Sequence, residues 1–153
     1  MTTFAESAAA PSQRKVDRLL AHYEESHRHP GNERIHFVAI PLIMLSLVGL
    51  LYALHPWVAY VFLAASLVYY ARLSVVFLGT MAVISAALVG LVMAMGDLVL
   101  PISVALFVGG WIAQFVGHKM EGRKPSFFED LQYLWVGPIF VLGKLFQKIG
   151  VRW

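Results

Sequence analysis

Residues 35–71 read IHFVAIPLIMLSLVGLLYALHPWVAYVFLAASLVYYA and contain no Asp, Glu, Lys or Arg in 37 positions. A helix needs about 20 mostly apolar residues to cross the hydrocarbon core of a bilayer. This stretch is therefore long enough to cross twice, with a turn at His55-Pro56. Two further uncharged runs follow, residues 73–96 and residues 98–118. The pattern predicts an all-α fold, a polytopic membrane helical bundle.

Working outward from this stretch, we expect about four transmembrane helices. They would cover residues 36–54, 57–71, 73–95 and 98–117. Residues 12–29 and 131–149 are too polar or too broken to span, so they are expected to be N- and C-terminal interfacial helices. Residues 1–11, rich in Ala, Ser and Thr, are expected to be a disordered tail, which makes residues 12–153 one membrane-embedded domain.

Composition and charge agree with this interpretation. Charged residues make up 14% of the chain, against roughly 25% in soluble proteins. Cysteine is absent, which excludes disulfides and thiolate metal sites. The net charge of +3 is interpreted as an excess of Lys and Arg that sets the orientation of the protein in the membrane, rather than as a sign of nucleic-acid binding. We therefore expect membrane lipids as surroundings and no nucleic acid as partner.

The basic residues also predict an orientation. Lys and Arg are missing from the turns at residues 55–56 and 96–97, and they lie in the segments that four spans place on the opposite side. That side is expected to be cytoplasmic. No apolar segment follows a basic start in the first 30 residues, which argues against a cleaved signal peptide. The membrane is expected to be a bacterial inner membrane or the endoplasmic reticulum. The sequence leaves open a homo-oligomer.

Histidines gather on the cytoplasmic side of this topology. They are His22, His27, His29, His36 and His118, and only His55 lies on the far side. Imidazole is a good ligand for Fe, Zn, Cu and Ni. His27 and His36 flank Pro30-Gly31, where the chain can fold back and present both rings to one ion. Glu121 follows His118 by three residues, a spacing that puts both on one helix face. The residues thus predict a metal site.

Two motifs resemble a known family. The first is Tyr23-x3-His27-x4-Asn32-x3-His36, followed by FVAIP at residues 37–41. The second is WIAQFVGH at residues 111–118, followed by Glu121 and Pro125. Together, in this order and with apolar spans between them, they are similar to the signatures of the Mpo1-like proteins over about residues 16–146. The fungal form has one more residue than this chain between the second motif's histidine and glutamate.

The resemblance implies an Fe(II)-dependent dioxygenase. The enzyme would use O₂ to oxidise 2-hydroxy fatty acids in α-oxidation and shorten them by one carbon. His27, His36 and His118 match the family's histidines and would bind iron, with His22, His29 and Glu121 as candidate further ligands. Tyr23, Asn32 and Gln114 would orient the ligands or the substrate, and with Glu121 they are the candidate catalytic residues. Arg123 or Lys124 would attract the substrate carboxylate.

Two other functions remain open from the residues. One is a zinc-dependent lipid hydrolase in which Glu121 is the general base. The other is a non-enzymatic lipid-binding membrane protein, in which the histidines are amphipathic side chains at the interface. Gln114 would then only join two helices, and Tyr23 would be an interfacial anchor.

Overall fold

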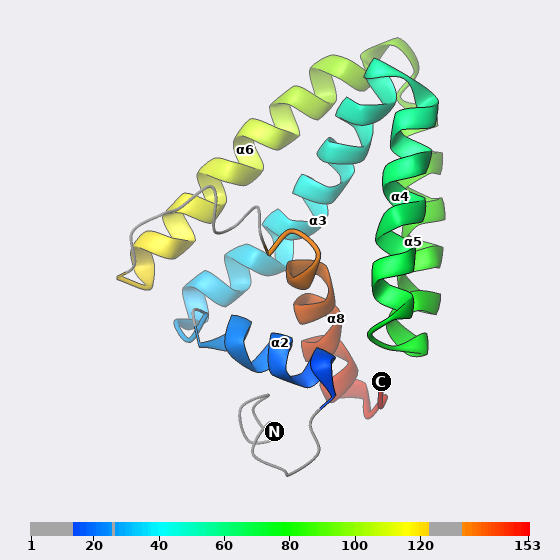
Figure 1. Cartoon of the computed structure of the whole chain (residues 1–153). Helices are drawn as coiled ribbons and strands as arrows, with labels where there is room; N and C mark the ends of the chain where they lie inside the picture. Colours follow the sequence, from blue (N-terminus) through cyan, green and yellow to red (C-terminus); the bar gives the residue numbers. More distant parts are fainter. Residues whose placement is uncertain (1–13, 26, 123–132) are drawn as a thin grey trace. The chain divides into compact units, whose positions relative to one another are not determined.

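The computed structural model describes residues 14–25, 27–122 and 133–153, and every regular element in these ranges is helical (Figure 1). The elements are α2 (Lys15–Glu24), α3 (Pro30–Leu54), α4 (Pro56–Ala71), α5 (Val75–Ala94), the short 3-10 helix η1 (Gly96–Leu98), α6 (Val99–Met120) and α8 (Val136–Ile149). The expected all-α fold is therefore confirmed. The expected disordered tail, residues 1–11, lies outside the described residues.

Among the described residues, three helices are long and apolar enough to cross a membrane. They are α3, α5 and the continuous segment Gly96–Met120, which joins η1 to α6. The fourth apolar helix, α4, has 16 residues, a length of about 24 Å, and is shorter than a straight span requires. Large apolar side chains at every fourth position of α6 are exposed, namely Leu100, Val104, Val108, Ile112 and Val116. An outward apolar stripe of this kind suits contact with lipid rather than water.

Local sequence explains where these helices begin. Pro30 and Pro56 each stand in the first turn of a helix, where the missing N–H costs nothing and the fixed φ favours helix. Before α4, the Nδ1 atom of His55 accepts from the backbone N–H of Trp57 at 3.3 Å. His55 is thus a helix cap, in agreement with its interpretation as turn structure. Before α5, the Ser74 hydroxyl accepts from the N–H groups of Val76 and Phe77.

The helix starts correct two expected boundaries. The first interfacial helix was expected to run to residue 29, but α2 ends at Glu24. The first span was expected from residue 36, but α3 already begins at Pro30. The chain therefore breaks before Pro30 rather than at Pro30-Gly31, because proline begins a helix more readily than it ends one. As a result, Asn32 lies in the first turn of α3.

The chain divides into two compact units. The second unit, residues 39–112, holds parts of α3 and α6 together with α4 and α5, and α4 and α5 lie side by side (Figure 1). Its buried core is formed by Val48, Ala59, Leu88 and Val92. Partly buried side chains such as Met44, Leu63 and Ile84 pack against this core.

The first unit combines the described parts of residues 1–38 and 113–153. Helices α2 and α8 pack together in it (Figure 1), and the Tyr23 and Phe140 rings meet at 4.9 Å. The Lys144 ammonium lies 2.5 Å from the Glu24 carboxylate and 3.8 Å from that of Glu33. This mostly buried ion pair joins α8 to α2. All the side chains of the candidate site lie in this unit.

Candidate metal centre

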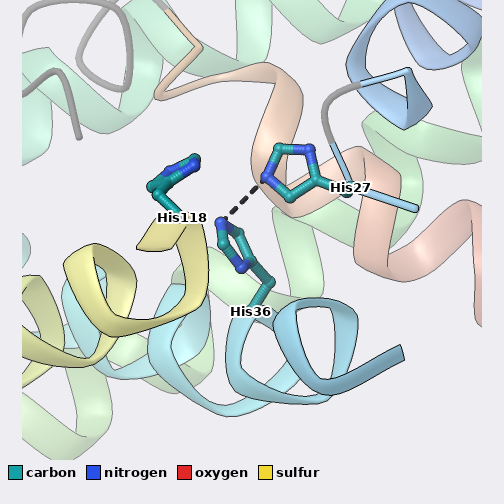
Figure 2. Close-up of side chains that lie close together, drawn as sticks. All are labelled: His27, His36 and His118. Atoms are coloured by element: carbon teal, nitrogen blue, oxygen red, sulfur yellow. Dashed lines mark hydrogen bonds between the residues drawn. The ribbon is translucent and has the colours of Figure 1, made fainter. Parts of the chain in front are cut away.

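Three histidines of the first unit converge in its interior. His27 precedes α3, His36 lies in the second turn of α3, and His118 lies in the last turn of α6. They are 3%, 1% and 7% exposed, respectively. One ring nitrogen from each lies within 4.8 Å of the others, and Figure 2 shows the three rings turned toward a common point. The spacing and the burial fit a metal centre with three neutral nitrogen ligands.

Backbone carbonyls fix the orientation of two of these rings. The Nδ1 atom of His27 lies 2.8 Å from the carbonyl oxygen of Tyr23, and that of His36 lies 2.9 Å from the carbonyl oxygen of Asn32. Carbonyl oxygens only accept hydrogen bonds, so each Nδ1 carries the hydrogen and each Nε2 presents a lone pair. Metal-binding histidines usually have this second hydrogen bond.

The two Nε2 atoms nevertheless lie only 2.9 Å apart (Figure 2). Two lone pairs at this distance repel each other unless a positive charge lies between them. The charge can be a proton shared by the two rings or a metal ion that both nitrogens bind. Because His118 provides a third nitrogen nearby, the arrangement of donors fits a metal ion.

Aromatic side chains form one wall of this cluster. The Tyr23 ring stacks on the His27 imidazole with centroids 4.1 Å apart and an angle of 9°. Tyr133 and Phe140 lie against Tyr23 in turn. The expected catalytic residue Tyr23 is therefore adjacent to the site, and its ring and its carbonyl both contact His27.

Glu121, at the end of α6, forms hydrogen bonds with the segment that contains His27. Its Oε1 accepts from the backbone N–H of Arg28 at 2.8 Å, and its Oε2 accepts from the N–H of His29 at 2.9 Å. The Asn32 side-chain amide also donates to Oε2, at 3.0 Å. Partial burial tends to raise the pKa of Glu121, but these hydrogen bonds outweigh it and hold the pKa below its usual value. Both oxygens of Glu121 are thus used within the protein.

Two of the candidate ligands lie outside the cluster. His22 is exposed and pairs with Glu25, 3.5 Å away. His29 is exposed, and its Nδ1 accepts from the N–H of Gly31 at the start of α3. The structure does not bring His22 or His29 to the three buried nitrogens, because one lies on the outer face of α2 and the other caps a helix. Their expected role as further ligands finds no support in this geometry.

Gln114 lies one helical turn before His118 on α6, which places the two on the same face. Its side chain is buried, and its Oε1 accepts no hydrogen bond from the described residues. A buried acceptor of this kind is costly unless a ligand or water supplies a donor. The two candidate substrate residues, Arg123 and Lys124, lie outside the described residues, so their role stays a prediction.

Gly117 belongs to the second motif, but its close approach to Asn32 was not anticipated from the sequence, nor was a polar cleft. A Cβ atom on Gly117 would lie 2.4 Å from Oδ1 of Asn32 and 3.5 Å from Cε1 of His36, so glycine permits a close approach of α6 to α3. A cleft of about 370 Å³ lies beside His27 and is lined by Ala21, Glu24, Glu25, His27, Arg28, Glu33 and Lys144. Glu24 and Lys144 are 120 residues apart in the chain, and no local spacing could have paired them.

Comparison with known proteins identifies the family. The model of the family described as "2-hydroxy-palmitic acid dioxygenase Mpo1-like" matches residues 13–149. The chain belongs to the Mpo1-like family. A relative in Saccharomyces cerevisiae, the 2-hydroxy-palmitic acid dioxygenase MPO1, is 29% identical over 138 residues, which cover 86% of this chain and 79% of the relative. No solved structure matches the chain. The matched region of the Mpo1-like chain includes all three buried histidines.

Proposed function

We propose that this Mpo1-like protein is an Fe(II)-dependent dioxygenase that acts on 2-hydroxy fatty acids at the cytoplasmic face of a membrane. The observation that carries the proposal is the buried group of His27, His36 and His118, in which two imidazoles present their Nε2 lone pairs to each other. The name of the yeast relative supplies the reaction and the substrate class.

The proposed reaction balances without a further cosubstrate. A 2-hydroxy fatty acid and O₂ would give a fatty acid one carbon shorter, CO₂ and water. The bond between C1 and C2 breaks, C2 is oxidised to the new carboxyl carbon, and O₂ is reduced. Bound iron would supply the redox chemistry that makes O₂ reactive. Zinc could not do so, because Zn²⁺ does not change its oxidation state.

The chain's own residues would have separate tasks in this reaction. His27, His36 and His118 would hold the ion. The ring of Tyr23, stacked on His27, would fix the plane of that ligand. Gln114 would accept a hydrogen bond from the 2-hydroxyl of the substrate, because its buried Oε1 has no donor among the described residues. Arg123 or Lys124 would attract the substrate carboxylate.

The membrane setting suits a lipid substrate. Helices α3, α5 and Gly96–Met120 have the length and composition of spans, and the outer face of α6 is apolar nearly to His118. The acyl chain of a fatty acid would therefore remain in apolar surroundings while its polar end reaches the histidines. Basic residues at the start of α2, namely Arg14, Lys15 and Arg18, favour a cytoplasmic location for the side of the membrane where the histidines lie.

Specific contacts weigh against both other functions. A zinc hydrolase would need Glu121 as a free base, but both of its oxygens accept hydrogen bonds from Arg28, His29 and Asn32. Histidines that only fill a membrane interface would be exposed, whereas these three are buried. Burying three imidazoles together is unfavourable unless they are paired or bind an ion.

The test uses the full chain purified in detergent without added metal. Elemental analysis should find iron, or the protein should take up Fe(II) at about one ion per chain. Incubation of the iron-loaded protein with 2-hydroxypalmitic acid and O₂ should yield the fatty acid one carbon shorter, detected by mass spectrometry. Palmitic acid without the hydroxyl and an oxygen-free reaction are the controls. If iron is bound but this product does not form, the assignment of 2-hydroxy fatty acids as the substrate is refuted. If zinc is bound and the protein hydrolyses lipids, the hydrolase function is supported instead.

A further inference from the structure

The carboxylate of Glu121 lies where three chain segments meet. Glu121 follows the last residue of α6 directly, three positions after His118. Its Oε1 accepts from the N–H groups of Arg28 (2.8 Å) and His29 (3.1 Å), and its Oε2 accepts from the N–H of His29 (2.9 Å) and from Nδ2 of Asn32 (3.0 Å). Hydrogen bonds to an ionised carboxylate are stronger than those between neutral groups.

The segment bound by Glu121 is the connection between α2 and α3, which carries His27. Arg28 and His29 directly follow His27, and neither lies within a helix. Their N–H groups would otherwise have to be satisfied by water or other partners, because such groups are rarely left unpaired. Glu121 therefore fixes the backbone next to His27 relative to the end of α6, and thereby relative to His118.

Asn32 extends this arrangement to the third histidine. Its backbone carbonyl accepts from Nδ1 of His36, while its side-chain amide donates to Glu121. Gly117 leaves room for the Asn32 side chain beside α6, since a Cβ there would lie 2.4 Å from Oδ1. The Glu121 carboxylate is thus connected to all three imidazoles. It reaches His27 through the neighbouring Arg28, His36 through Asn32, and His118 through the backbone of its own segment.

We propose that Glu121 is a positioning residue that clamps the His27 segment and Asn32 to the end of α6, so that the three imidazole nitrogens come within binding distance of one ion. In this role it neither binds the metal nor acts as a general base. The proposal rests on the proposed metal function and concerns how that site is assembled. It also gives this glutamate a task that depends on its place in the turn after α6 rather than on helical spacing from His118.

The test reverses the polarity of one hydrogen bond. In Glu121→Gln an amide nitrogen replaces one of the two oxygens and faces donors, so the two hydrogen bonds that this oxygen accepted are lost. In Asn32→Asp two carboxylates face each other. The double variant Asn32→Asp/Glu121→Gln keeps the net charge of the natural chain and again places a donor opposite an acceptor between positions 32 and 121. The glutamine oxygen then takes the place of Oε1 and still accepts from Arg28 and His29, while the second His29 bond, to Oε2, is not restored. Asp97→Asn, at the exposed turn of η1, is the matched control for loss of one negative charge.

Two quantities are measured on full-length protein in detergent: the affinity for Fe(II) without oxygen, by competition with a coloured chelator, and the hydrogen exchange of the Arg28 and His29 amides. We expect each single variant to bind Fe(II) about 10–100-fold more weakly, as for other groups that orient metal ligands, and to exchange these amides faster. The double variant should regain most of the affinity, and Asp97→Asn should match the natural chain.

The proposal is overturned if Glu121→Gln binds Fe(II) as tightly as the natural chain. It is also overturned if the double variant binds no better than the single variants, because a carboxylate that binds metal or acts as a base would not be replaced by this exchange. If Glu121→Gln does not fold, the double variant decides in the same way. A natural chain that binds no Fe(II) would instead refute the proposed function, while amide exchange would still test the clamp.

Discussion

His27 and His36 direct their Nε2 atoms at each other across 2.9 Å, although the Nδ1 of each ring already donates to a backbone carbonyl. A positive charge between the two Nε2 atoms would therefore stabilise this arrangement of the rings. Both residues come from a segment of ten positions around the start of α3, and this local pair becomes a three-nitrogen site only when His118 joins it.

Loss of a buried ring should abolish tight metal binding. We expect His36→Ala to weaken Fe(II) affinity by more than about 100-fold, beyond the range found for groups that only orient ligands. His22→Ala removes an exposed imidazole paired with Glu25 and should leave the affinity unchanged. Metal titration of both variants measures the difference. Equal loss in the two variants would contradict the assignment of ligands.

The role of Tyr23 can be separated into its ring and its hydroxyl. Tyr23→Phe keeps the ring that stacks on His27, so we expect Fe(II) affinity close to that of the natural chain. Tyr23→Ala removes a buried ring and should lower the free energy of unfolding by about 3–5 kcal/mol, together with the metal affinity. Thermal unfolding and metal titration measure these effects. Normal iron binding but no turnover in Tyr23→Phe would assign the hydroxyl to the reaction.

Gly117 should tolerate no side chain. In Gly117→Ala the Cβ would lie 2.4 Å from Oδ1 of Asn32, and overpacking of this kind costs about 1–3 kcal/mol. Gly109→Ala, on the same helix, meets no atom within 4 Å and should be neutral or slightly stabilising, because alanine favours helix. Unfolding temperatures of the two variants test the difference, and a stable Gly117→Ala with normal metal binding would show that Asn32 can move freely.

Substrate selection is expected to depend on Gln114. Gln114→Leu removes the buried acceptor proposed for the 2-hydroxyl, and loss of one hydrogen bond of about 0.5–1.5 kcal/mol should raise the KM for a 2-hydroxy fatty acid by up to about tenfold. Binding of the same fatty acid without the hydroxyl should not change, nor should iron content. An unchanged KM would remove Gln114 from the substrate site.

Acid should destabilise the protein partly through Glu121. Hydrogen bonds lower the pKa of this carboxyl in the folded state, below the value of about 4.3 expected when unfolded. Its contribution to stability is therefore complete above a pH of about 4.3 and is lost as the pH falls through the folded-state pKa. The unfolding temperature of the natural chain should fall more steeply than that of Glu121→Gln as the pH drops below about 4.3. Parallel curves would mean that the carboxylate contributes nothing.

The long helices could be predicted from the sequence, because uncharged runs act locally, whereas the role of Pro30 as a helix start was missed. The uncharged runs indicated the long helices, and the topology they imply placed His27, His36 and His118 on one side of the membrane. The roles of His22 and His29 could not be separated from those of their neighbours in the same way. Whether an imidazole faces inward, as His27 does, or caps a helix, as His29 does, depends on where α3 begins, and that start lies six residues before the expected one.

Contacts between distant residues were the part that sequence reasoning missed. The Lys144–Glu24 pair joins two helices at opposite ends of the chain, and Lys144 alone suggests only a basic residue at a membrane surface. Glu121 was identified as a candidate ligand because its spacing from His118 is helical. Its actual partners, Arg28 and His29, come from a connection whose backbone path no periodicity describes.

The bond between Arg28 and Glu121 joins positions 93 residues apart. During synthesis His27 and His36 leave the ribosome long before α6 exists, and only insertion of α6 brings His118 and Glu121 to them. Retention of an ion should therefore report that insertion has reached the end of α6, since a chain that stops before α6 carries only part of the binding site. Metal binding, if it occurs, would thus depend on how far the chain has been inserted as well as on its folding.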